Sequence, residues 1–89
     1  MKIKLELFGA SREFSNKDYL EFNFKKKISI KVFRKEIISY INENFKGNEN
    51  FKKIVATSAF CSEDNHIIND NYKINKDQKI AIIPPIGGG

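Results

Sequence analysis

The residues with the most distinctive chemistry lie at the C-terminal end of the sequence, where Pro84-Pro85-Ile86 is followed by three glycines. Glycine loses more conformational entropy on ordering than any other residue, so Gly87, Gly88 and Gly89 are not expected to stabilise a folded core. A segment without Cβ atoms can enter a narrow tunnel in another protein and bring the carboxyl group of Gly89 to an active site. Because that carboxylate is ionised at neutral pH and is a poor electrophile, we expect another enzyme to activate it as an acyl-adenylate.

The two prolines separate these glycines from the rest of the chain. Pro84 and Pro85 lack backbone donors and have a fixed φ, so they predict that the last strand ends at Ile83 and an extended segment follows. Fully extended, residues 84–89 would span about 20 Å. We therefore divide the chain into a folded domain, residues 1–83, and a flexible tail, residues 84–89. The alternative is an inert, frayed terminus or a cloning remnant.

Two other residues with reactive side chains give weaker signals. Cys61 is the sole cysteine, which excludes an intramolecular disulfide and a cysteine-based zinc site and suits a reducing compartment. A nucleophilic thiol would need a base, and only His66 is near in sequence, so a buried or half-buried thiol is the better interpretation. His66 has no second histidine or cysteine to complete a metal site and is expected at the surface. We expect no metal and no cofactor bound by the chain itself.

The elements that must position the tail follow from hydrophobic periodicity. Residues 2–8 alternate strictly and place Ile3, Leu5 and Leu7 on one face of a strand, and residues 19–25 alternate again. The two strands should pair, with a loop or helical turn at residues 10–13 after Gly9. Residues 30–45 instead have apolar positions at spacings of three and four, which predicts an amphipathic helix. Ser29 is its expected N-cap, and Gly47 is expected to end it in a left-handed conformation.

The second half of the chain predicts further strands. Residues 48–53 are interpreted as a loop or short helix, residues 56–61 as a third strand and residues 66–68 as a short fourth strand. Residues 75–78 form a turn, and residues 79–83 form a strand with little alternation, which indicates burial on both faces or a central position. One amphipathic helix covering one mixed sheet is an α+β domain. If the last strand lies parallel to the first, the fold is the β-grasp, or ubiquitin-like, fold.

The overall composition fits one small cytosolic domain. The chain has 89 residues, with 16 Lys and Arg against 11 Asp and Glu, a net charge of +5. The lysines are spread along the sequence, so a solvated surface is favoured over a nucleic-acid site. No apolar run approaches the length of a membrane span, and the N-terminus lacks a signal-peptide pattern. We expect a cytoplasmic protein that binds neither nucleic acid nor membranes.

The chain resembles the small, sulfur-carrier subunit of molybdopterin synthase, the MoaD family, within the ubiquitin-like sulfur carriers that include ThiS. The resemblance is strongest over residues 80–89, with the Pro-Pro spacer and terminal glycines, and over residues 7–13. It departs at Gly87, where relatives usually have Ser or Thr, and over residues 58–69. The resemblance implies partner contacts at these positions: Phe8, Arg12, Ile83, Pro84, Pro85 and Ile86. From the residues alone, Phe8 can instead pack under a loop, and Arg12 can be an ordinary surface charge.

The resemblance also implies a mechanism. A ubiquitin-activating-type enzyme would use ATP to adenylate Gly89, and a sulfur donor would convert the adenylate to a thiocarboxylate. The tail would enter the large synthase subunit, in a heterotetramer, and donate sulfur to a cyclic pyranopterin precursor of the molybdenum cofactor. The chain would be a non-catalytic sulfur-donor subunit of a sulfurtransferase. The alternatives are a sulfur carrier for thiamine thiazole or thiolated tRNA, and a β-grasp binding module with an inert tail.

Overall fold

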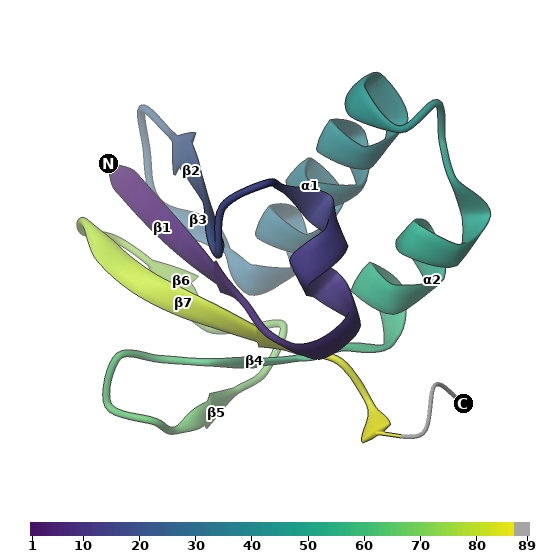
Figure 1. The fold of residues 1–89 in the computed structure, drawn as a ribbon. Coiled ribbons are helices and arrows are strands. Elements are labelled where there is room, and N and C mark those ends of the chain that lie inside the picture. Colours follow the sequence, from purple (N-terminus) through teal and green to yellow (C-terminus); the bar gives the residue numbers. More distant parts are fainter. Residues whose placement is uncertain (87–89) are drawn as a thin grey trace.

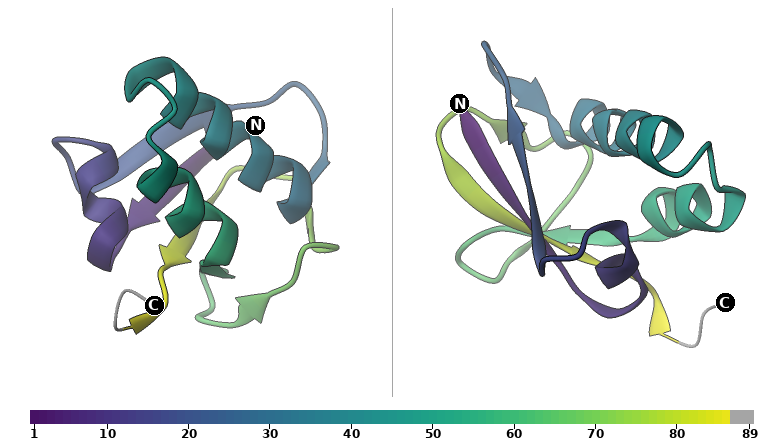
Figure 2. Two further views of the ribbon diagram at one scale, coloured as in Figure 1. Left: turned by 90° about the vertical axis from the view of Figure 1, so that its right-hand side faces the viewer. Right: turned by 45° about the horizontal axis from the view of Figure 1, so that its top comes forward.

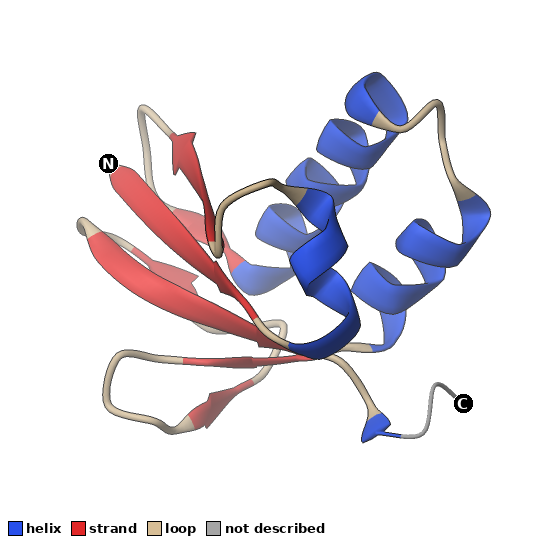
Figure 3. Ribbon diagram, viewed as in Figure 1, coloured by secondary structure: helices blue, strands red, loops and turns tan. Residues whose placement is uncertain are grey.

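A computed structural model describes residues 1–86, and the predictions made for Gly87, Gly88 and Gly89 lie outside this range. The α-helices lie in the middle of the chain, with strands before and after them (Figure 3). The elements, in chain order, are β1 (Lys2–Leu7), the 3-10 helix η1 (Gly9–Phe14), β2 (Tyr19–Asn23), β3 (Ile28–Ser29), α1 (Ile30–Asn44), α2 (Glu49–Thr57), β4 (Ala59–Cys61), β5 (Ile67–Ile68), β6 (Lys73–Ile74) and β7 (Gln78–Ile83).

The main sheet has the strand order β2-β1-β7-β4-β5, with the first and last strands of the chain side by side at its centre (Figure 1). β1 and β7 run parallel, with Leu5 opposite Ile80, whereas β2 pairs antiparallel with the other edge of β1. β4 pairs antiparallel with β7, and β5 with β4. This is the predicted mixed sheet with a central parallel pair, and the α+β, β-grasp prediction is confirmed.

Both α-helices cover the same face of this sheet (Figure 2). The alternation predicted for β1 is confirmed, since Ile3, Leu5 and Leu7 are buried. They pack against the buried stripe of α1, which consists of Ile30, Phe33, Ile37 and Ile41. The opposite face of the sheet has no helix on it among residues 1–86, so polar and charged residues alternate with the core positions along β1.

The ends of α1 agree with the expected caps, with one difference. The Ser29 hydroxyl accepts a hydrogen bond from the Val32 N–H at 3.2 Å, which satisfies one free donor at the helix start. Gly47 has a φ of +68°, as predicted for the helix end. Lys46 already adopts a φ of +53°, so two consecutive residues reverse the chain before α2.

The predicted third strand at residues 56–61 is wrong at its beginning, because Ala56 and Thr57 are the last residues of α2. The Asn48 side chain caps this helix by accepting from the Phe51 N–H at 3.0 Å. Its buried residue, Val55, joins the core. The helix therefore continues through the region predicted as strand, and β4 begins only at Ala59.

Two other details were not predicted. β3 and β6, of two residues each, form a separate small sheet in which Ile28 pairs with Ile74. Such short strands lack enough residues for an alternating pattern to be recognised. The last strand was predicted to be either central in the sheet or buried on both faces. β7 is central, but it is not buried on both faces. Ile80 and Ile82 are buried, whereas Ile83 is 37% exposed.

Aromatic rings fill the space between α1 and the sheet. The ring centroid of Phe33 lies 5.3 Å from that of Phe22, 5.9 Å from Phe24 and 6.1 Å from Phe60. Near the other end of α1, the Tyr40 hydroxyl donates a 2.6 Å hydrogen bond to the Phe14 carbonyl. Burial raises the pKa of Tyr40, so the hydroxyl keeps its proton and remains a donor at neutral pH.

Arg34 connects α1 to the C-terminal end of α2. Its guanidinium donates to the carbonyls of Val55 and Ser58, both at 2.8 Å, and forms an ion pair with Asp70 at 2.9 Å. It also stacks over the Phe60 ring at 4.8 Å. Carbonyls at a helix end have no partner within the helix, so Arg34 satisfies groups that would otherwise be unpaired. The contact fixes the position of α2 relative to α1.

Candidate functional site

The candidate site is the region where the chain leaves the centre of the sheet at Ile83, at the end of β7 (Figure 1). The segment passes close to the start of η1. Gly9 has a φ of +55°, and a Cβ built there would lie 3.8 Å from both Cδ and Cγ of Pro84. Gly9 therefore both permits the left-handed turn into η1 and lies directly beside Pro84.

Most of the predicted partner-binding residues lie around this point, and all of these except Pro84 are exposed. Phe8 continues β1 in an extended conformation beyond Leu7, so its side chain lies on the face opposite the core, where it is 41% exposed. Because Leu7 pairs with Ile82, the register places Phe8 next to Ile83. Pro84 is half-buried, and Pro85 and Ile86 are exposed, Ile86 completely.

Arg12 is exposed on η1, the 3-10 helix that begins at Gly9. The local structure of η1 is stabilised by the buried Ser11, whose hydroxyl donates to the Phe8 carbonyl at 2.6 Å and accepts from the Phe8 N–H at 3.0 Å. Arg12 takes part in none of the salt bridges found within residues 1–86.

The outer face of the sheet extends this apolar region across further strands that the sequence analysis did not include. Ala59 lies opposite Ile83, and Cys61 lies opposite both Ala81 and Ile67. Directly paired residues share a face of the sheet, so these side chains lie on the same side as Ile83. We call this set the outer patch: Phe8, Ala59, Cys61, Ile67, Ala81 and Ile83. Ile67 is 77% exposed and is the most exposed member of the outer patch.

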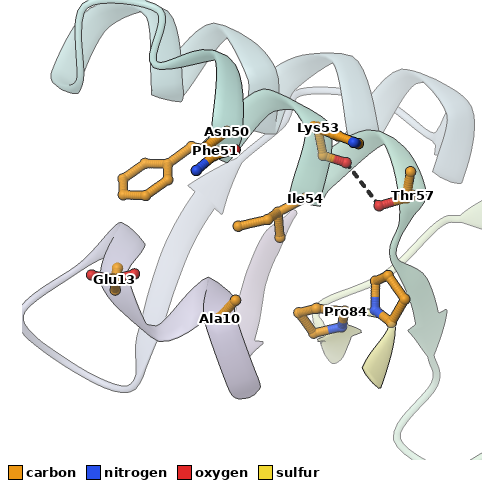
Figure 4. A pocket seen from close by; sticks show the side chains of 9 residues that line it. Ala10, Glu13, Asn50, Phe51, Lys53, Ile54, Thr57 and Pro84 are labelled. Carbon is orange, nitrogen blue, oxygen red and sulfur yellow. Dashed lines mark hydrogen bonds between the residues drawn. The ribbon is translucent and has the colours of Figure 1, made fainter. Parts of the chain in front are cut away.

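A groove of about 410 Å³ lies on the other side of Pro84, between η1 and α2 (Figure 4). Ile54 and Ala10 face its interior, and Pro84 is at one end. The Thr57 hydroxyl at its rim donates to the Lys53 carbonyl at 2.8 Å. Its lining residues are Ala10, Glu13, Asn50, Phe51, Lys53, Ile54, Thr57, Pro84 and Pro85. The groove was not predicted, because it depends on α2 packing beside η1.

The two reactive side chains of the second half lie as expected. Cys61 is half-buried and His66 is exposed in the turn between β4 and β5. Within residues 1–86 no group of three or more His, Cys, Asp or Glu side chains is arranged to hold a metal ion. In the same part of the chain, none of the helices combines the length and apolar character needed to cross a bilayer.

Comparison with known proteins places the chain by its fold. No family model matches the sequence, and no curated protein matches it. Molybdopterin converting factor subunit 1 from Pyrococcus furiosus superposes with a TM-score of 0.68 at 16% identity, covering 96% of this chain and 98% of that one. SAMP1 from Haloferax volcanii superposes with a TM-score of 0.69 at 10% identity, covering the whole of both chains.

These similarities define the class of fold to which the chain belongs. It has the β-grasp, ubiquitin-like fold over essentially its whole length, and that fold is shared with molybdopterin converting factor subunit 1 and with SAMP1. The resemblance drawn from the residues of the sequence is therefore confirmed at the level of fold.

Proposed function

We propose that the chain is a ubiquitin-like sulfur carrier and acts as the small subunit of a molybdopterin synthase. The observation that carries the proposal is the position of the Pro-Pro-Ile-Gly-Gly-Gly segment. Pro84, Pro85 and Ile86 follow the central strand of a β-grasp sheet at an exposed point flanked by apolar residues, and the sequence continues from Ile86 with Gly87, Gly88 and Gly89. The folded domain, residues 1–83, is the part that partner proteins recognise, and the reacting group is the carboxylate of Gly89.

In the proposed reaction, a Gly89 carboxylate oxygen attacks the α-phosphate of ATP in the active site of an adenylating partner, and pyrophosphate leaves. A sulfur donor at the oxidation level of sulfide then attacks the carbonyl carbon, and AMP leaves with its oxygen. The resulting thiocarboxylate has sulfur in place of one oxygen. In the large synthase subunit, this sulfur forms a bond to a carbon of the pyranopterin precursor, and an oxygen substituent leaves that carbon. Water then hydrolyses the bond between the Gly89 carbonyl carbon and sulfur, which releases the chain with its carboxylate restored, and two rounds supply both sulfurs of the dithiolene.

The test of this proposal is the mass of the protein purified from its native host. We expect a fraction of the chain to be heavier by the difference between one sulfur and one oxygen atom, with fragmentation placing the change on Gly89. Treatment with a thiol-alkylating reagent that also modifies thiocarboxylates should label the same residue, with Cys61 as an internal reference. Persistent absence of the heavier form in cells that make the cofactor would refute the proposal.

The outer patch gives a prediction about the large subunit. Phe8→Glu should weaken association by about tenfold or more, because it removes an apolar contact and brings a carboxylate into the interface. Titration calorimetry on the purified subunits measures the change. Val32→Glu is the control, since Val32 is also 41% exposed but lies on α1. Equal affinities for the Phe8 and Val32 variants would show that Phe8 is outside the interface.

A further inference from the structure

The groove between η1 and α2 has mainly apolar walls and a volume of about 410 Å³. Its interior is formed by Ala10, Phe51, Ile54 and the two prolines, and its rim carries one acid and one base, Glu13 and Lys53. Phe51 and Ile54 are partly buried and pack on the core, so the floor of the groove is held in place. Ligand-binding cavities commonly have this combination of apolar walls and a few polar groups.

The groove is continuous with the base of the tail. Pro84 and Pro85 form its wall, and Gly9 separates it from the outer patch. Phe8 belongs to the outer patch and Ala10 lines the groove, and Gly9, which lies beside Pro84, stands between them in the chain. A partner protein that contacts Ile83, Pro85 and Ile86 therefore also lies along the edge of the groove.

The size of a stable interface supports the same conclusion. Specific complexes bury roughly 800 Å² on each partner. The most exposed members of the outer patch, Phe8, Ile67 and Ile83, all lie on the outer face of the sheet and not on the helix side of the tail. A partner that encloses the tail also covers its helix side, where Pro84 and Pro85 line the groove.

We propose that this groove receives an apolar side chain of the large synthase subunit when that subunit encloses the tail. The inference rests on the proposed function and adds to it a second contact, on the helix side of the tail. A polar or charged group of the partner flanking that side chain would face Lys53 or Glu13 at the rim.

Filling the groove tests the proposal. Ala10→Trp places a large ring where the partner side chain would bind, and Ala10→Lys places a charge there. Ala56→Trp and Ala56→Lys are the matched controls, because Ala56 is likewise an exposed alanine but does not line the groove. By calorimetry with the large subunit, both Ala10 variants should bind about tenfold more weakly or worse, and both controls within about twofold of wild type.

Tryptophan fluorescence shows whether the introduced ring occupies the groove, because the natural sequence has no tryptophan. The emission of the Ala10→Trp protein should lie to the blue of that of the Ala56→Trp protein. Wild-type affinity in both Ala10 variants would overturn the docking proposal while the thiocarboxylate on Gly89 still upheld the proposed function. Absence of the thiocarboxylate from the wild-type protein would instead refute both the docking proposal and the proposed function.

A small-molecule site is the other possible outcome, and NMR distinguishes it. We expect the large subunit to shift the signals of the Ile54 methyl groups and the Phe51 ring. If free indole, used as the probe, binds saturably and shifts these signals while the large subunit leaves them unmoved, the groove is a small-molecule site and the proposal is wrong.

Discussion

Removing Gly88 and Gly89 is expected to abolish molybdopterin formation completely while leaving the thermal unfolding midpoint unchanged. The proposed mechanism needs a terminal carboxyl group at the end of a full-length tail. A tail shortened by two residues no longer presents this group to the active site of the adenylating enzyme or of the large subunit. The core residues, by contrast, all lie between Ile3 and Ile82. In vitro synthesis with the large subunit measures the first effect, and calorimetric unfolding measures the second.

Gly87→Ser is the control for this deletion, since it keeps the length of the tail and adds only a small hydroxymethyl side chain. It should retain most of the activity. Cofactor synthesis by the shortened chain at the wild-type rate would disprove the assignment of the Gly89 carboxyl as the reacting group, even if the fold comparison remained unchanged.

Phe33→Ala is expected to cause the largest loss of stability from a single substitution in α1. Phe33 is fully buried, and its ring contacts the rings of Phe22, Phe24 and Phe60. Truncating a buried phenylalanine costs about 3–5 kcal/mol, out of a total of about 5–15 kcal/mol for a typical domain. A large part of the free energy of unfolding should therefore be lost, as measured by urea titration.

Phe8→Ala provides the matched comparison, because it truncates the same residue type where the side chain is 41% exposed and outside the core. It should change the free energy of unfolding by about 0.5 kcal/mol or less. If both variants lost similar stability, Phe8 would be a packing residue, and its assignment to the outer patch would be wrong.

The parts of the fold with strong periodicity could be predicted from the sequence. Ile3, Leu5 and Leu7 indicated a strand with one buried face, and the three-and-four spacing from Ile30 indicated α1. The start of β4 was misplaced because the residues around Val55 do not show the alternation of apolar and polar residues that is typical of a strand. The pattern there therefore does not distinguish the end of a helix from the beginning of a strand. β3 and β6 are held by pairing between distant residues, which leaves no local pattern.

The candidate site was predictable to a similar degree. Continuing the alternation of β1 correctly places the Phe8 side chain away from the core, and the prolines correctly mark the end of the sheet at Ile83. Ile67 and Cys61 could not be added to the outer patch, because their place beside Ala81 depends on strand pairing. The groove depends on how α2 packs against η1, which is a property of the tertiary structure.

The contact between Arg34 and the C-terminal end of α2 has a consequence for recognition. Because the guanidinium holds the carbonyls of Val55 and Ser58, the helix that supplies Phe51 and Ile54 is fixed before any partner arrives. A binding surface that is already ordered loses less conformational entropy on association, so more of the contact energy remains as affinity. Arg34, which is remote in sequence from the tail, thus preorganises the surface beside it.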